Sequence, residues 1–268
     1  MRNADRFYAA RDFVVYYGYG LEALASRFDV AVLEPAARTP DAVRTIQAAG
    51  TLVLAYFSLL ETQPGEDGHG LKASDLLRLA DAPYQAPGSG NFVIDPRSRA
   101  CARRMEKKIA VLAKGPYDGV LVDTAGDIED HRLPERHELV FAAASLMHCI
   151  RAVWPGAVIC QNWGLEQLKE QTVNVIDGFC WENYNRALRN DWFWQTLRWL
   201  ERQDGWKTLL LGETQAPGQQ LATGDRDMAL QGLKPGFASY LAPKGYCSGI
   251  NSDWLACLER LRAGSCAR

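Results

Sequence analysis

The length, composition and charge of the chain limit what it can be. It has 268 residues, of which 47% are hydrophobic and 23% are charged, and its formal net charge is −2. This balance is ordinary for a globular protein and lacks the basic excess that nucleic-acid binders carry. No apolar stretch approaches the ~20 residues of a membrane helix. We therefore expect a single domain over residues 1–268, with neither nucleic acid nor a membrane as its partner.

A short apolar run recurs along the chain, and most copies end in a polar or acidic residue. The runs are rich in Val, Leu, Ile and aromatic residues and are continuous rather than alternating, which is typical of parallel strands buried on both faces. In chain order they predict strands over residues 13–18, 30–34, 52–58, 92–95, 120–123, 158–162, 179–182 and 209–213.

Helical patterns separate most of these strands. The first covers residues 40–49, with Thr39 as its N-cap and Gly50 as its C-cap. Further helices are predicted after the fourth, fifth and seventh strands, over residues 96–114, 134–154 and 191–203. Strands that alternate with helices predict a parallel sheet with right-handed crossovers.

Eight strands favour closure into a (β/α)8 barrel, the TIM-barrel fold of the α/β class. An open, doubly wound sheet is the alternative, and the lack of a GxGxxG turn after an early strand weakens it. A ninth apolar run, residues 237–241, is either the true eighth barrel strand, which would displace a neighbour, or one accessory strand. Residues 61–90 form a long segment with Gly and Pro after the third strand, and such loops on a barrel are commonly functional.

Polar side chains at the strand ends form a candidate site. In a parallel barrel the catalytic residues lie at the carboxyl ends of the strands, and here these ends carry several acids but no His or Cys. The pattern therefore argues against a cysteine nucleophile and a histidine-based triad. Because HExxH and HxH spacings are absent, we expect no metal, with a carboxylate-bound Mg²⁺ or Ca²⁺ as the remaining alternative. The strand-end residues are Glu34, Ser58 with Glu61, Asp95 with Arg97, Asp123, Asn162, Glu182 and Glu213.

Two similar phrases single out one pair of carboxylates. The phrases DGVLVD, which ends at Asp123, and DGFCWE, which ends at Glu182, both have Asp-Gly before a strand and an acid after it. Their first residues, Asp118 and Asp177, are expected at the bottom of the barrel in structural roles. Glycosidic bond cleavage needs two carboxyl groups across a cleft. One protonates the leaving oxygen, and the other attacks the anomeric carbon or activates water.

These phrases resemble those of glycoside hydrolase family 114. The resemblance runs in order over roughly residues 13–213 and includes VICQN ending at Asn162, LAYFS followed by Glu61, and FVID followed by Arg97. It implies a TIM barrel that needs no cofactor and has endo-α-1,4-polygalactosaminidase activity, with Asp123 and Glu182 as the catalytic pair. It also implies a secreted or extracytoplasmic protein, although the first 11 residues show no apolar core of a signal peptide.

The chain departs from the family pattern at three strand ends. Residues 58–61 are SLLE where the family usually has Ser-x-Gly-Glu, Gln161 precedes Asn162 where the family often has Lys, and Glu34 replaces a common Asp. These changes lie in the expected substrate cleft. They bear on the sugar that is bound more than on the type of reaction.

An acidic rim suits a cationic polysaccharide such as polygalactosamine with free amines, because opposite charges attract. Asp127 adds to the acids of this rim, and aromatic side chains near the strand ends can stack on sugars or contact a protonated amine. Tyr17 and Tyr184 are among these aromatics. The expected substrate-binding residues are Tyr16, Glu34, Tyr56, Ser58, Glu61, Asp95, Arg97, Asn162, Trp163, Trp181 and Glu213.

We expect Asp123 to be the nucleophile and Glu182 the acid and base of a retaining glycoside hydrolase that acts on an α-1,4-linked galactosamine polymer as a monomer. The reverse assignment and an inverting mechanism remain alternatives. A non-catalytic sugar-binding barrel is a second hypothesis, since fold does not determine function. A metal-dependent hydrolase or lyase is a third. Convergence of the two carboxyl groups to within ~10 Å is the observation that separates the first hypothesis from the second. A bound metal would be the sign of the third.

Overall fold

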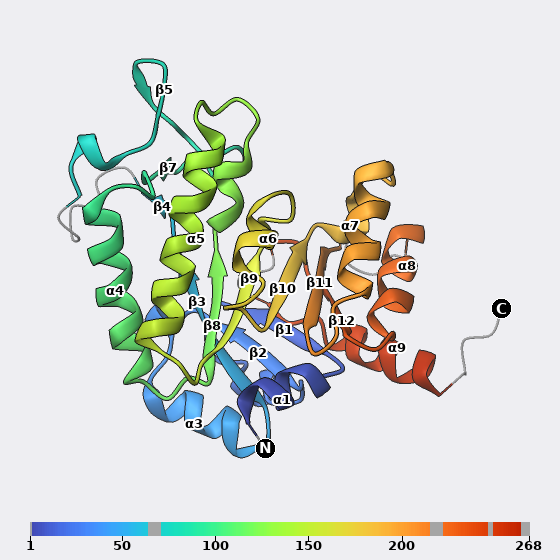
Figure 1. The fold of residues 1–268 in the computed structure, drawn as a ribbon. Coiled ribbons are helices and arrows are strands. Elements are labelled where there is room, and N and C mark those ends of the chain that lie inside the picture. Colours follow the sequence, from blue (N-terminus) through green and yellow to red (C-terminus); the bar gives the residue numbers. More distant parts are fainter. Residues whose placement is uncertain (1, 64–70, 215–221, 246–248, 264–268) are drawn as a thin grey trace.

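Eight parallel strands form a barrel at the centre of the molecule (Figure 1). The computed structural model describes residues 2–63, 71–214, 222–245 and 249–263. The order of the strands follows the chain, and a parallel bridge between Asp12 and Ser239 joins the last strand to the first. The chain is therefore a (β/α)8 barrel. Its strands are β1 (Phe13–Tyr16), β2 (Val30–Leu33), β3 (Leu52–Ser58), β8 (Gly119–Asp123), β9 (Val158–Asn162), β10 (Gly178–Glu182), β11 (Lys207–Glu213) and β12 (Phe237–Ala242).

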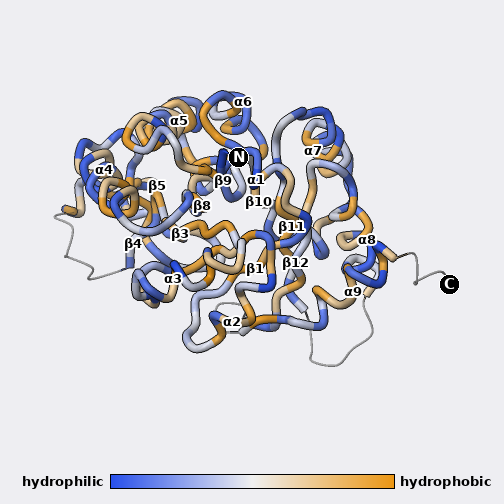
Figure 2. Tube along the Cα trace, turned by 90° about the horizontal axis from the view of Figure 1, so that it is seen from below, coloured by the Kyte–Doolittle hydropathy of each residue, from blue (hydrophilic) through white to orange (hydrophobic). Residues whose placement is uncertain are grey.

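Helices surround the ring of strands, and a further helix, α1, lies across its lower end (Figure 2). No helix in the described part of the chain is both long enough and apolar enough to cross a lipid bilayer. The elements are α1 (Asn3–Ala9), α2 (Glu22–Ala25), η1 (Pro35–Ala37), α3 (Pro40–Ala48), η3 (Ala73–Asp75), α4 (Arg99–Ala113), η4 (Ala125–Glu129), α5 (Arg136–Val153), α6 (Leu168–Thr172), η5 (Tyr184–Arg186), α7 (Asp191–Glu201), α8 (Thr223–Gly232) and α9 (Ser252–Arg262).

Local sequence signals account for most helix boundaries. Thr39 caps α3, because its hydroxyl accepts a hydrogen bond from the amide of Ala42 at 3.2 Å, and Gly50 adopts a φ of 99° just beyond its end. Asn190 caps α7 in the same way, through the amide of Phe193. The start of α4 differs from the prediction, since the helix begins at Arg99 with Ser98 as its N-cap rather than at Pro96.

The prediction of a barrel strand over residues 92–95 is wrong. Only Phe92 and Val93 form a strand, β7 (Phe92–Val93), and it pairs antiparallel with β4 (Glu61–Thr62) outside the barrel. The ninth apolar run supplies the missing barrel strand, β12, which pairs with β11 over its whole length. Val93 and Ile94 are apolar because they are fully buried beneath the long segment after β3, and not because they belong to the barrel.

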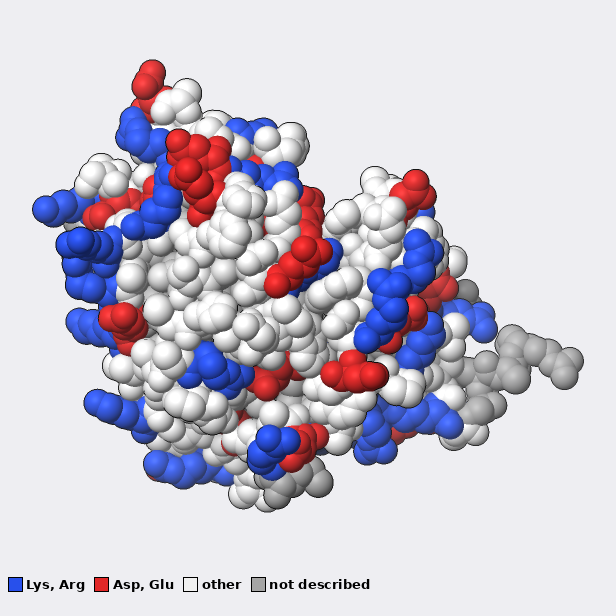
Figure 3. Space-filling view, in the orientation of Figure 1, with Lys and Arg blue, Asp and Glu red and all other residues white. Residues whose placement is uncertain are grey.

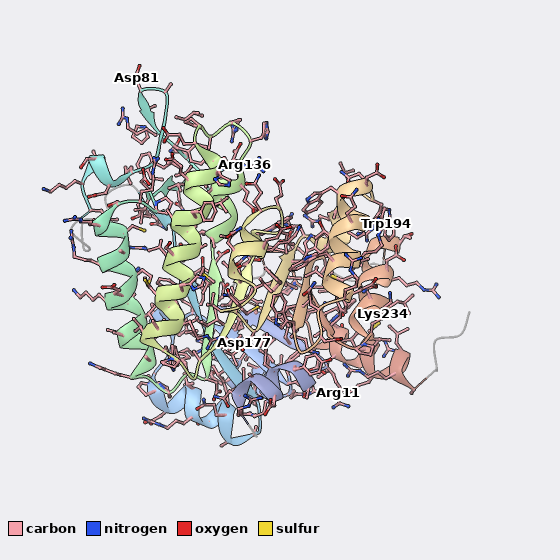
Figure 4. All side chains as sticks on the ribbon, viewed as in Figure 1. Arg11, Asp81, Arg136, Asp177, Trp194 and Lys234 are labelled. Carbon is pink, nitrogen blue, oxygen red and sulfur yellow. The ribbon has the colours of Figure 1, made fainter. Side chains whose placement is uncertain are left out.

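The segment between β3 and α4 is an insertion that rises above the barrel (Figure 1). Besides β4 and β7, it contains a small hairpin of β5 (Arg78–Leu79) and β6 (Ala82–Pro83), with Asp81 at its tip (Figure 4). The hydroxyl of Tyr84 donates to Asp130 at 2.6 Å, which ties the insertion to the loop after β8. The insertion therefore has fixed contacts with the rim that carries the candidate site.

The acids that precede strands hold the lower end of the barrel. Asp118 Oδ2 accepts hydrogen bonds from the amide of Val53 at 2.8 Å and the side chain of Gln47 at 2.9 Å. Asp177 Oδ2 accepts hydrogen bonds from the amide of Ile159 at 2.8 Å and from the side chain of Arg151 at 2.7 Å. Figure 4 shows Asp177 near the lower ends of the strands. Both acids thus join neighbouring strands far from the upper rim.

Candidate active site

Asp123, Asn162 and Glu182 meet at the carboxyl ends of three adjacent strands, β8, β9 and β10. The amide nitrogen Nδ2 of Asn162 donates to Asp123 Oδ1 at 2.7 Å and to Glu182 Oε2 at 3.1 Å. These two carboxylate oxygens therefore lie no more than about 5.8 Å apart, the sum of the two distances. This limit on the oxygen–oxygen distance is compatible with the ~5–5.5 Å between the carboxyl groups of retaining glycosidases.

Three donors surround the carboxylate of Asp123. Besides Asn162, the hydroxyl of Tyr56 donates to Oδ2 at 2.8 Å, and the backbone amide of Thr124 donates to Oδ1 at 2.8 Å. Burial and the charge of Asp123 raise the pKa of Tyr56, so its hydroxyl keeps its proton. Hydrogen bonds of this kind stabilise negative charge on a carboxylate and hold its orientation.

Glu182 lies in a different environment. Burial raises the pKa of Glu182, the hydrogen bond from Asn162 lowers it, and the charges of Asp123 and Glu213 raise it further. The net direction is upward. Glu182 is thus easier to protonate than an exposed glutamate, whereas Asp123 is surrounded by hydrogen-bond donors, so the two carboxyl groups have different environments.

A left-handed residue follows each of the three strand ends. Thr124, Trp163 and Asn183 have φ values of 65°, 56° and 58°. This conformation is unfavourable for a β-branched residue such as Thr124, but its hydroxyl accepts hydrogen bonds from the amides of Leu60 at 2.9 Å and Glu61 at 3.4 Å. The backbone therefore turns sharply behind Asp123, Asn162 and Glu182, and Thr124 joins this turn to the start of the insertion.

A second carboxyl pair lies beside the first. Burial, followed by the charge of the nearby Glu61, raises the pKa of Asp127 to about 9. Glu61 Oε2 also accepts a hydrogen bond from Asn91 at 2.7 Å. With its pKa raised to about 9, Asp127 holds its proton at neutral pH.

The other predicted residues of the rim fall into two groups. Glu34, Ser58 and Glu61 line one cavity together with Tyr56. Glu213 lies near enough to Glu182 to affect its pKa, and it is held by Arg186 at 3.1 Å. Trp163 is half-buried in the turn after β9.

Four predicted residues lie away from the carboxylate pair. Tyr16 is fully buried with the guanidinium of Arg38 4.7 Å from its ring centroid, and Trp181 is fully buried against the aromatic side chains of α7. Asp95 and Arg97 pair with each other at 2.8 Å, and Arg97 also contacts Glu135 before α5. Because Asp95 does not end a barrel strand, its contacts are those of the insertion.

Some residues of the site carried little sequence signal. Tyr17, one residue beyond Tyr16, is the tyrosine that packs against Tyr56, with 4.8 Å between ring centroids. Thr124 directly follows Asp123 and could have been found as part of the same strand end. Asn91 belongs to the insertion, where no periodic pattern places a side chain, so its contact with Glu61 was not predictable.

Comparisons with solved structures agree with this architecture, whereas no protein-family model and no curated protein matches the sequence. The glycoside hydrolase domain of PelA from Pseudomonas aeruginosa is 19% identical, with a TM-score of 0.69 over 90% of this chain and 99% of that domain. Ega3 from Aspergillus fumigatus, solved in complex with galactosamine, is 12% identical, with a TM-score of 0.66 over 90% and 93%.

A more distant likeness extends to other sugar-active barrels. An α-galactosidase from Thermus thermophilus is 14% identical, with a TM-score of 0.59 over 94% of this chain and 62% of that one. At these identities the likeness concerns the fold. The chain is thus a TIM barrel whose structural neighbours are glycoside hydrolase domains, among them those of PelA and Ega3.

Proposed function

We propose that this chain is a retaining glycoside hydrolase of family 114 type that cleaves α-1,4-linked galactosamine polymers. The observation that carries the proposal is the shared amide of Asn162, which holds one oxygen of Asp123 and one of Glu182 within about 5.8 Å. A non-catalytic sugar-binding barrel has no need for two carboxyl groups at this spacing. The spacing supports the roles of a nucleophile and an acid on opposite sides of a glycosidic bond.

The environments of the two carboxyl groups suggest their roles. Glu182 donates its proton to the glycosidic oxygen as the bond from that oxygen to the anomeric carbon breaks, and Asp123 forms an ester with the same carbon. The leaving chain departs as an alcohol. Glu182, now ionised, takes a proton from water, whose oxygen attacks the anomeric carbon and releases Asp123 as a carboxylate. The two steps together return the enzyme to its starting protonation.

Two observations support an amino-sugar substrate. Glu34, Glu61 and Glu213 lie around the carboxylate pair and would attract a protonated amine. Among the described residues, no donor reaches the buried Oδ1 atom of Asn162, which leaves an acceptor for a hydroxyl or amino group of a bound sugar. The galactosamine bound to Ega3 is a ligand of the same class in a similar fold.

The experiment is the release of reducing ends from partially deacetylated poly-α-1,4-galactosamine. We expect activity in the wild type, and a loss of about 10²–10⁴-fold for Glu182→Gln because the acid is removed. Asp123→Asn should lose at least as much, since no ester can form. Asp81→Asn makes the same chemical change at the exposed tip of the β5–β6 hairpin and should retain full activity.

The outcomes separate the competing functions. Cleavage of a different glycan through the same two residues would support the mechanism and overturn the substrate. Binding of galactosamine oligomers without cleavage by the wild type would favour the sugar-binding barrel. Full activity in a folded Asp123→Asn variant would refute the assigned pair.

The stereochemistry of the product tests the assignment of the nucleophile. A retaining enzyme releases the α-anomer first, and proton NMR of the initial product distinguishes this from the β-anomer before mutarotation mixes them. We expect the α-anomer. An initial β-anomer would make Asp123 a base that activates water instead of a nucleophile.

A further inference from the structure

A large groove leads away from the catalytic pair towards helix α4. Its volume is about 1040 Å³, at the upper end of the ~300–1,000 Å³ typical of small-ligand pockets. Tyr56, which donates to Asp123, lines its inner end together with Glu34 and Glu61. The groove therefore reaches the tyrosine that donates to Asp123, and its volume is enough for more than one sugar unit.

The outer wall of the groove is one face of α4. The residues of this face lie three or four positions apart, as one side of a helix requires. They are Ala100, Arg103, Lys107 and Val111, together with their neighbours Arg104, Lys108 and Leu112. Figure 3 shows Lys and Arg side chains gathered along the edge of the molecule over α4. The groove is thus acidic where it meets the barrel and basic along the helix.

The basic residues of this wall do not share one role. Arg104 is buried, and its Nη1 and Nη2 atoms donate to the backbone carbonyls of Leu59 and Glu61 at 3.2 and 3.3 Å. Its charge supports the turn after β3. Arg103 and Lys107, in contrast, are exposed and stand four residues apart on the same helix face.

Arg103 and Lys107 are poorly compensated by acids. In the described part of the chain neither forms a salt bridge, and two like charges at this spacing disfavour the helix. Asp75 lies near enough to be affected by Arg103, but Ser98 and the amide of Lys72 already bind its carboxylate. A cationic pair in a groove attracts an anionic group of a ligand.

We propose that this groove binds the polysaccharide on one side of the cleaved bond and that Arg103 and Lys107 bind a carboxylate carried by one of its sugars. The inference rests on the proposed function for its inner end, where Glu34 and Glu61 accept an amino sugar. A ligand that spans the groove then bears an amine near the catalytic pair and an acid towards α4. The substrate is a polysaccharide of mixed charge, and a fully deacetylated polyamine is a poorer ligand.

The test is calorimetric binding to the full chain carrying Asp123→Asn, which prevents turnover. Four α-1,4-linked hexasaccharides serve as probes: the all-amine galactosamine oligomer, two oligomers that are N-succinylated at two sugars of one end or of the other end, and oligogalacturonate. Succinylation replaces an amine by a carboxylate on an unchanged backbone. We expect one end-succinylated oligomer to bind about tenfold more tightly than the all-amine oligomer, and the advantage to shrink as salt screens the charges.

Variants locate the effect on the helix. Arg103→Glu with Lys107→Glu should abolish the tenfold advantage. Arg99→Glu with Lys114→Glu reverses the same number of charges at exposed positions of the same helix region outside the groove lining, and should keep it. Loss of the advantage in both double variants would point to net charge and overturn the proposal.

The remaining outcomes distinguish this inference from the proposed function. Equal affinity for all galactosamine oligomers overturns the carboxylate site and leaves the proposed function standing. Binding of oligogalacturonate that depends on Arg103 and Lys107, without binding of any galactosamine oligomer, supports the anionic site and overturns the proposed function.

Discussion

A single side-chain amide couples the two carboxyl groups of this site. Asn162 Nδ2 supplies one hydrogen to Asp123 and the other to Glu182, so any displacement of Asn162 changes both groups at once. Tyr56 and the amide of Thr124 act on Asp123 alone. The donors are therefore unequal, and their removal should have different consequences.

Removal of the Tyr56 hydroxyl tests the role of Asp123. A hydrogen bond to a charged group contributes about 1.5–3 kcal/mol, and each 1.4 kcal/mol lost from the transition state slows the reaction about tenfold. We expect Tyr56→Phe to lower kcat by about 10–100-fold with little change in melting temperature. Tyr19→Phe removes the hydroxyl of an exposed ring and should leave kcat unchanged. Equal kcat values for the two variants would contradict the proposed support of Asp123.

The pH profile of activity tests the role of Glu182. The charge of Glu213 raises the pKa of Glu182, so Glu213→Gln should lower that pKa. If Glu182 acts as the acid, the alkaline limb of kcat against pH then moves to lower pH. Glu34→Gln removes a charge at another point of the rim and should leave this limb in place. A limb that stays fixed in Glu213→Gln, or moves upward, would argue against Glu182 as the acid.

The central residues of the site are predictable because strand ends converge. Asp123, Asn162 and Glu182 each end an apolar run, and parallel strands in a barrel bring such ends together. Tyr17 was harder to choose over Tyr16, because a shift of one residue reverses the face of a strand. The pairing of Asp127 with Glu61 depends on the path of the insertion, which no local pattern specifies.

At the scale of elements, apolar runs identified the strands but not their partners. The runs 92–95 and 237–241 both consist of apolar residues, yet β7 pairs antiparallel outside the barrel and β12 pairs parallel within it. Burial alone explains both runs, since periodicity cannot separate a short buried strand of one kind from another. Helices were predicted more closely, because caps such as Thr39 act locally.

Two glycines at the starts of strands permit the close packing of the barrel. A Cβ atom on Gly119 would lie 2.0 Å from the carbonyl oxygen of Val158, and one on Gly178 would lie 2.0 Å from that of Lys207. We expect Gly119→Ala and Gly178→Ala each to destabilise the fold by about 1–3 kcal/mol or more in urea unfolding. Gly156→Ala has open space around its Cβ and should have almost no effect. Equal midpoints for Gly119→Ala and Gly156→Ala would contradict this packing.

The many acidic side chains of the rim make the free energy of unfolding of the whole molecule depend on pH. The pKa of Asp127 is raised to about 9 by burial and by Glu61, whereas an exposed Asp titrates near 4. Between these values the folded chain binds one proton more than the unfolded chain. Stability from this group is thus complete below pH ~4 and declines as pH rises to about 9, by at most about 1.4 kcal/mol per pH unit.

The variant Asp127→Asn lacks this titration. We expect the urea midpoint of Asp127→Asn to increase relative to that of the wild type as pH rises from 6 to 9. Near pH 4 this relative increase should be absent. Asp81→Asn serves as the exposed control and should follow the wild type at every pH. Parallel curves for Asp127→Asn and the wild type would show that Asp127 is ionised in the folded chain.

The antiparallel pair of β4 and β7 has a consequence for how such a barrel can diversify. Because Glu61–Thr62 and Phe92–Val93 lie side by side, the chain leaves the rim and returns to it at the same point. Because β3 and β8 pair directly with each other in the barrel, we expect changes in the residues between β4 and β7 to leave the position of Asp123 unchanged. A foreign loop grafted between Thr62 and Phe92 would therefore change the wall above the rim while Asp123, Asn162 and Glu182 keep their places at the strand ends.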